Sequence, residues 1–140
     1  MPDIRSFRLG AVLVSATALM AAQPAPNRPA QHGCDVNSPH AASFIATANA
    51  TFPRLDSLRV SRLGWQRAPK SVTLVKEAKK CDAIVAAHNK FVDGKQEYRL
   101  SNAVIAQAGN SYLVEVPPGN GVAQHMIFVY DSTLKFTAIY

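Results

Sequence analysis

KEAKKCDAIVAAHNKFV, residues 76–92, has the clearest periodicity in the chain. Cys81, Ile84, Val85, His88 and Val92 fall at i, i+3, i+4, i+7 and i+11, which forms one continuous stripe on a helix. The charged side chains lie off this stripe. The spacing predicts an amphipathic helix that packs Cys81 and His88 against a core. A lone histidine on such a stripe is typical of a hydrogen-bonded core or boundary residue.

The segments around this helix have the pattern of β-strands. Before it, residues 71–75 (SVTLV) are rich in β-branched side chains. After Asp93 and Gly94 end the helix, two hairpins follow. Their strands are AVIAQ (103–107), SYLVEV (111–116), QHMIFVY (124–130) and KFTAIY (135–140). The first pair is joined by a short turn in which Gly109 is suited to positive φ.

Alternate residues of these strands form apolar rows that the helix stripe could cover. The rows are Tyr112, Val114 and Val116, then Met126, Phe128 and Tyr130, and then Phe136, Ala138 and Tyr140. A short helix is expected over residues 38–50, with Ser38 as its cap, whereas residues 55–65 fit helix and strand alike. We therefore expect an α+β fold, in which one long helix packs on a four- to five-stranded antiparallel sheet.

The N-terminus has the pattern of an export signal. Arg5 and Arg8 precede an uncharged run, residues 9–22, that is too short to span a membrane, and small residues allow cleavage after Ala18 or Ala22. Residues 23–33 are Pro-rich and lack large apolar side chains, which is typical of a disordered lead. We expect a signal peptide at 1–22, this lead at 23–33 and a single domain at 34–140.

Cys34 and Cys81 are expected to form a disulfide, because an even pair in a small exported domain is most simply a bridge. A reactive thiol is one alternative. The other is a metal site that uses His32 and His88 together with the two cysteines. The pairs have no recognised ligand spacing, and Cys81 and His88 lie two helical turns apart, about 10 Å, which disfavours a shared ion.

Positive charge is concentrated between residues 54 and 80. Eight basic side chains in this basic segment face only Asp56 and Glu77, which gives it a net charge of +6. They are Arg54, Arg59, Arg62, Arg67, Lys70, Lys76, Lys79 and Lys80. Such a segment favours an anionic partner, such as lipid headgroups or acidic glycans. Nucleic acid is disfavoured because Trp65 is the one aromatic residue in the segment. A solvated face of a basic protein is the alternative interpretation.

Two resemblances cover the C-terminal part of the chain. The order of SVTLV, a cysteine in the next helix, YLVEVPP and FVYDSTLKFTAIY resembles small exported bacterial proteins to which no activity is assigned. The run 104–130 is similar to the hairpin region of cystatins, with Gly109, Tyr112, Val116 and His125 in comparable places. This similarity implies a sheet wrapped on a helix. The inhibitory residues are not matched, because Ile105 and Gln107 replace the loop glutamine and valine of that family.

We predict no catalytic residue, metal or cofactor. The G-x-S-x-G pattern is missing, and the Gly-rich run 119–121 precedes a strand, so it is a turn and not a phosphate loop. His125 and Met126 point to opposite faces of a strand and cannot hold one copper ion. Glu115 lies on the strand face opposite to Tyr112 and Val114, and no feature pairs it with another acid.

The expected function is therefore that of an exported, non-enzymatic binding or accessory domain. A cystatin-like protease inhibitor is one alternative, and a binder of polyanions or membrane surfaces through the basic segment is another. The partners that fit this expectation are an anionic envelope component or another exported protein, with no transmembrane span in the mature chain.

Overall fold

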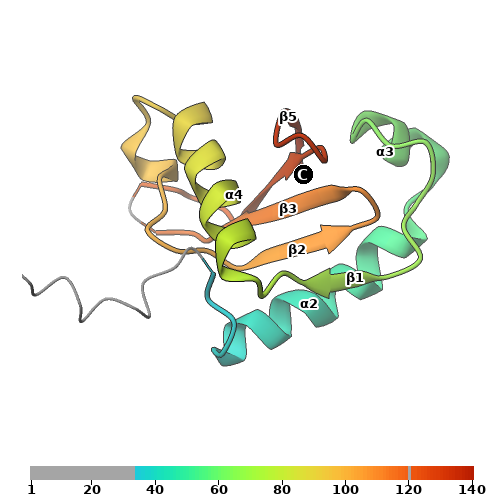
Figure 1. Ribbon diagram of the computed structural model, residues 1–140. Helices are drawn as coiled ribbons and strands as arrows, with labels where there is room; N and C mark the ends of the chain where they lie inside the picture. The colour runs from blue at the N-terminus through green and yellow to red at the C-terminus, as the bar shows by residue number, and fades with distance from the viewer. Residues whose placement is uncertain (1–33, 120) are drawn as a thin grey trace, which may run out of the picture. The chain divides into compact units, whose positions relative to one another are not determined.

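Helices lie on both faces of a five-stranded sheet in the computed structural model, which describes residues 34–119 and 121–140 (Figure 1). All of these residues belong to one unit, His32–Tyr140. The expected signal peptide and the lead at 23–33 lie outside the described residues. The elements are α2 (Pro39–Thr51), η4 (Phe52–Arg54), α3 (Ser57–Arg62), β1 (Val72–Leu74), α4 (Ala78–Phe91), η5 (Gln96–Tyr98), β2 (Ile105–Ala108), β3 (Ser111–Val116), β4 (Met126–Tyr130) and β5 (Phe136–Ile139).

The sheet has the order β1-β2-β3-β4-β5, and every neighbouring pair is antiparallel, which confirms the α+β class. β2 and β3 form a hairpin in which Ala108 pairs with Ser111. The two-residue turn between them has Gly109 at a φ of 61°, a conformation that costs glycine no Cβ clash. Among the described residues, no helix is both long enough and apolar enough to cross a membrane.

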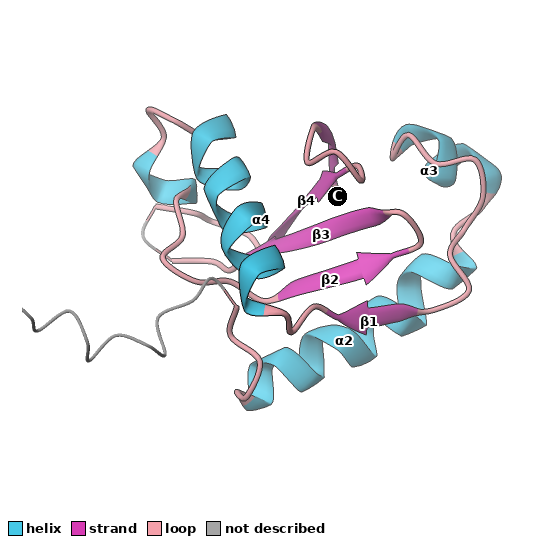
Figure 2. Ribbon diagram, viewed as in Figure 1, coloured by secondary structure: helices cyan, strands magenta, loops and turns pink. Residues whose placement is uncertain are grey.

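Both faces of the sheet are buried, which the sequence analysis expected for one face only. Val114, Val116 and Phe128 pack under α4, whereas Leu113 and Val129 pack under α2. The fold therefore has two helices of similar length, 13 residues in α2 and 14 in α4, where one long and one short helix were expected (Figure 2). The second helix is needed because alternate strand residues point to opposite faces and both sets are apolar.

Capping residues set the helix boundaries near the expected positions. The Ser38 hydroxyl accepts a hydrogen bond from the Ala41 amide at 3.1 Å and begins α2, as predicted. In residues 55–65, whose sequence fitted helix and strand alike, Asp56 caps α3 by accepting a hydrogen bond from the Arg59 amide at 2.9 Å. Gly64, with a φ of 80°, follows its end. Residues 55–65 thus contain a short helix and no strand.

The expected apolar row of Phe136, Ala138 and Tyr140 is wrong, because the pairing of β5 with β4 contains a β-bulge. Phe136 pairs with Tyr130 and Ala138 pairs with Val129, so two residues of β5 span one step of β4. This bulge turns Phe136 toward the α4 face and Ala138 toward the α2 face. Tyr140 also lies on the α2 side, where its ring is 4.9 Å from that of Phe52.

His88 is a fully buried, hydrogen-bonded core residue, as the helix stripe predicted. Its Nε2–H donates to the Tyr98 carbonyl at 2.8 Å, since a carbonyl only accepts. Nδ1 then accepts from the Tyr130 hydroxyl at 2.6 Å. Burial lowers the pKa of His88, and the Tyr98 carbonyl partly opposes this by raising it. The neutral imidazole is therefore the form that fits the core.

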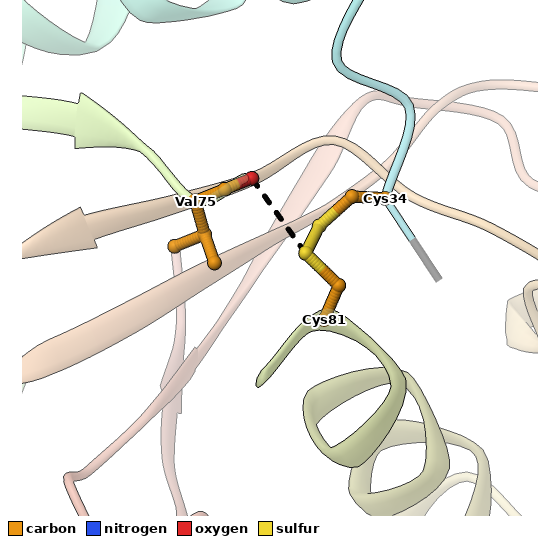
Figure 3. The surroundings of a disulfide bond; sticks show 3 residues. All are labelled: Cys34, Val75 and Cys81. Carbon is orange, nitrogen blue, oxygen red and sulfur yellow. Dashed lines mark hydrogen bonds between the residues drawn. A yellow bond between two sulfur atoms is a disulfide. The ribbon is translucent and has the colours of Figure 1, made fainter. Parts of the chain in front are cut away.

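The disulfide between Cys34 and Cys81 joins the segment before α2 to the first turn of α4 (Figure 3). The two Cα atoms are 5.3 Å apart, within the usual range for a bridge. Both cysteines are buried, and the Cys81 sulfur contacts the Val75 carbonyl oxygen at 3.7 Å. The Asp35 amide donates to the Ala103 carbonyl at 2.8 Å. The chain that leads into α2 is thus fixed at both a covalent and a hydrogen-bonded point.

Candidate functional site

Glu115 is a buried carboxylate on the α2 face of the sheet. Its side chain is 3 % exposed, and its neighbours on this face include Leu113 and Ile127, which are almost fully buried. It lies on β3, directly opposite Ile127 of β4. An ionised carboxylate in such surroundings requires partners, because burial without them is costly.

Two histidines supply these partners. His40 Nε2 lies 2.7 Å from Oε1 and 2.8 Å from Oε2 of Glu115. His125 Nε2 lies 2.6 Å from Oε2. Because an ionised carboxylate only accepts, each imidazole donates Nε2–H to it. The side chains of His40 and His125 remain 55 % and 45 % exposed, so this His–Glu–His cluster has a buried centre and two accessible ends.

The cluster stands at one end of a cavity of about 420 Å³ between α2 and the sheet. This volume falls at the lower end of the range of small-molecule sites. Most of the wall is apolar or aromatic, and Glu115 is its one acidic side chain. The lining residues are His40, Ser43, Phe44, Thr47, Ala48, Thr51, Phe52, Glu115, His125, Ile127 and Tyr140.

Helix α2 contributes most of this lining through two rows spaced four residues apart. One row runs from His40 through Phe44 and Ala48 and continues to Phe52, the residue after the helix. The other consists of the hydroxyl residues Ser43, Thr47 and Thr51. Residues four apart lie one above another on a helix face. The cavity therefore has an apolar wall with a histidine at its start and a row of hydroxyls beside it.

The rest of the lining comes from other elements. β3 places Glu115 inside, and the loop from β3 to β4 brings in His125. That loop is held by a pair of hydrogen bonds between Gly119 and Val122, both at 2.9 Å, and by burial of Val122. Opposite them, the Tyr140 backbone exchanges two hydrogen bonds with Ile127, at 2.8 and 3.2 Å. The site is thus built from segments far apart in the sequence.

The cluster is arranged as a hydrogen-bonded network rather than as a metal centre. In the described part of the chain, no group of three or more His, Cys, Asp and Glu side chains could hold a metal ion. His40 and His125 direct the Nε2 atoms that would bind a metal at the carboxylate instead. Neither Nδ1 has a partner among the residues that the structure describes. Each Nδ1 can therefore act as an acceptor when the imidazole is neutral and as a donor when it is protonated.

The basic segment contributes no basic side chain to the lining of this cavity. Its first part, Arg54–Lys70, belongs to η4, α3 and the loop before β1. Its second part, Lys76–Lys80, follows β1 and begins α4 (Figure 1). Seven of the eight side chains are exposed, and Lys80 Nζ lies 5.9 Å from the centre of the Tyr112 ring. None of the eight lines the cavity. Binding of an anionic surface through this segment stays a prediction.

Of the residues that carry the similarity to cystatins, His125 alone lines the cavity. Gly109 turns the β2–β3 hairpin, and Val116 is buried beneath α4. Inhibition of a cysteine protease likewise stays a prediction.

Ser132 and Lys135 in the β4–β5 turn have an S-x-x-K spacing, which in serine nucleophiles depends on a helical turn between the two side chains. Here the segment is a tight turn that Asp131 organises by accepting from the amides of Thr133 and Lys135 at 2.9 and 3.0 Å. The spacing therefore carries no nucleophile.

The His–Glu–His cluster was not predicted from the sequence. His40 and Glu115 are 75 residues apart, so no local spacing links them. One signal was present: Glu115 is the single charged residue of SYLVEV, a strand with apolar residues at both alternations. A strand buried on both faces requires a partner for such a carboxylate. Comparison with protein-family models, curated proteins and solved structures finds no match for this chain.

Proposed function

We propose that this chain is an exported, non-enzymatic binding domain that takes up a small molecule in the cavity between α2 and the sheet. The observation that carries the proposal is the His–Glu–His cluster, in which a buried carboxylate holds two half-exposed imidazoles at the end of an apolar cavity. A mostly apolar pocket with a few convergent polar groups is the usual form of a small-molecule site.

The export part of the proposal is supported by the N-terminal sequence and the disulfide. Arg5 and Arg8 precede an uncharged run that ends in small residues, as in a secretory signal. A buried bridge between Cys34 and Cys81 is typical of a protein that folds in an oxidising compartment.

Binding without catalysis is supported by how the imidazoles are used. A nucleophile needs a base within hydrogen-bond distance. The three aliphatic hydroxyls that line the cavity belong to Ser43, Thr47 and Thr51. Within the described residues, His40 and His125 hydrogen-bond to the carboxylate and not to these hydroxyls. The arrangement offers donors and acceptors to a ligand and holds no activated nucleophile.

The proposal is tested by amide chemical shifts of the mature protein titrated with a mixture of small aromatic and aliphatic fragments, charged and uncharged. We expect shifts to concentrate at residues 43–52, 115, 125–127 and 140. Thr47→Trp, on the exposed lip of the cavity, should abolish them by filling the space. Ala50→Trp is the matched control, because Ala50 is exposed on α2 and lies outside the lining. Shifts that are scattered, or that persist in Thr47→Trp, would refute the proposal.

A further inference from the structure

We infer that the ligand of this cavity is an amphipathic monoanion, a carboxylate on an apolar or aromatic body, whose anionic group is held by His40 and His125. The inference rests on the proposed function and specifies its ligand. It follows from three features of the cavity: which polar atoms are presented, what charge they carry together, and what surrounds them.

The polar end of the cavity presents imidazoles and not the carboxylate. Glu115 is 3 % exposed, whereas the side chains of His40 and His125 are about half exposed. Both oxygens of Glu115 already accept hydrogen bonds from Nε2 atoms. A ligand that enters the cavity therefore meets the imidazole rings of His40 and His125 rather than the carboxylate. The buried carboxylate of Glu115 orients the two rings through its hydrogen bonds to their Nε2 atoms.

The charge of this end fits one negative ligand group. With both imidazoles protonated, two positive charges face the single negative charge of Glu115, which leaves a net charge of +1. Each imidazolium then has one N–H on Glu115 and a second, on Nδ1, for the ligand. A monocarboxylate would complete an alternating row of charges through charge-assisted hydrogen bonds. Tyr140 is the one other titratable side chain in the lining, which contains no Lys, Arg or Asp.

The remaining wall selects an apolar body. Phe44, Phe52 and Ile127 line the cavity beyond the cluster, and the ring of Tyr140 packs on Phe52 at 4.9 Å. Inorganic phosphate or a sugar phosphate would bury a second charge against these rings, where no cation pairs with it. An aromatic or short aliphatic acid buries its apolar part against them.

The test compares 3-phenylpropanoate with its uncharged amide by isothermal titration calorimetry on the mature protein. At pH 6 we expect the acid to bind at least tenfold more tightly than the amide. At pH 8 this preference should be smaller by at least tenfold, while the affinity for the amide stays within about twofold.

Variants assign the effect to the cluster. His125→Gln and His40→Gln should each lose the preference for the acid and its pH dependence, while still binding the amide. Ala50→Gln places the same side chain on α2 outside the cavity and should behave as the parent protein. His125 lies in a loop and is half exposed, so His125→Gln tests the inference even if His40→Gln disturbs α2.

Different results would overturn the proposal of a binding cavity and the inference of an anionic ligand. If acid and amide bind equally and Thr47→Trp blocks both, the cavity is a binding site and the inference of an anionic ligand is overturned. If neither compound binds, or if binding survives in Thr47→Trp, the cavity is not the site and both proposals are overturned. A preference for the acid that persists in both histidine variants also overturns the inference.

Discussion

Removal of the disulfide is expected to be the most damaging small change to this fold. Cys34 and Cys81 are 47 residues apart in the sequence, and the bridge restricts the unfolded chain over that span. In the chain-entropy model, a loop of this length corresponds to a stabilisation of about 4 kcal/mol. Domains of this size are stable by only about 5–15 kcal/mol in total. The bridge is therefore a large share of the free energy of unfolding.

The assay is thermal and urea unfolding, followed by circular dichroism, with and without a phosphine reductant. At roughly 4–6 °C per kcal/mol, reduction should lower Tm by roughly 15–25 °C. The variant C34A/C81A should show the same loss and no response to reductant. Reduced parent protein keeps both sulfur atoms, so a difference between it and the variant measures packing around Cys81, which is fully buried.

The bridge should also hold the chain that leads into α2 in place, because Cys34 lies six residues before His40. Reduction should speed amide exchange at Asp35, whose N–H donates to the Ala103 carbonyl. A loss of less than about 1 kcal/mol on reduction, well below the loop estimate, would refute the reasoning. It would mean that the segment from Cys34 to α2 is held by its hydrogen bonds and packing alone.

Three further changes test the core and the site. Because burial lowers the pKa of His88, the unfolded chain takes up a proton at a higher pH than the folded chain does. The free energy of unfolding should therefore be highest above about pH 6.5 and fall as the pH drops below it. Urea unfolding between pH 5 and 8 should show that His88→Gln loses most of this pH dependence of the free energy of unfolding. Glu115→Met replaces a buried carboxylate with an apolar side chain and leaves its two histidine partners half exposed to water, so the free energy of unfolding should stay within about 1 kcal/mol or rise, while binding of the acid is lost. Destabilisation by more than about 3 kcal/mol would show that Glu115 is required by the fold. Asn49→Ala removes the side chain that donates to the Val72 carbonyl at 2.7 Å and accepts from the Val72 amide at 2.8 Å. Urea unfolding should show that this variant is destabilised by about 2–3 kcal/mol. Asn110→Ala, in the exposed β2–β3 turn, is the control and should change the free energy of unfolding by less than about 0.5 kcal/mol.

Sequence patterns predicted the parts of the fold that local physics determines. The stripe from Cys81 to Val92 identified α4 and the burial of His88, since an amphipathic helix has one apolar face. Ser38 marked the start of α2, and Gly109 marked the β2–β3 turn, because their caps and backbone angles depend on neighbouring residues. Each of these features rests on interactions within a few residues.

Features that depend on distant partners could not be predicted in this way. The bulge in β5 is set by its pairing with β4, and one extra residue places Ala138 on the opposite face of the sheet from Phe136. The position of α2 on the second face follows from buried apolar residues on four separate strands, β1 to β4. The cluster of His40, Glu115 and His125 forms only when α2 lies on this face of the sheet. Its chemistry is therefore a property of the tertiary structure.

The disulfide also makes a covalent ring of residues 34–81, which contains α2, α3, β1 and the first turn of α4. Strands β2 to β5 lie outside this ring and pack against it. A single cut by a protease in the exposed chain between α3 and β1 would open the ring without releasing a fragment, since both ends remain joined through sulfur. Such a nicked molecule could keep α2, and with it the histidine wall of the cavity, on the sheet. After a cut in residues 34–81, the disulfide, and not an unbroken backbone, would keep the two pieces of the chain together.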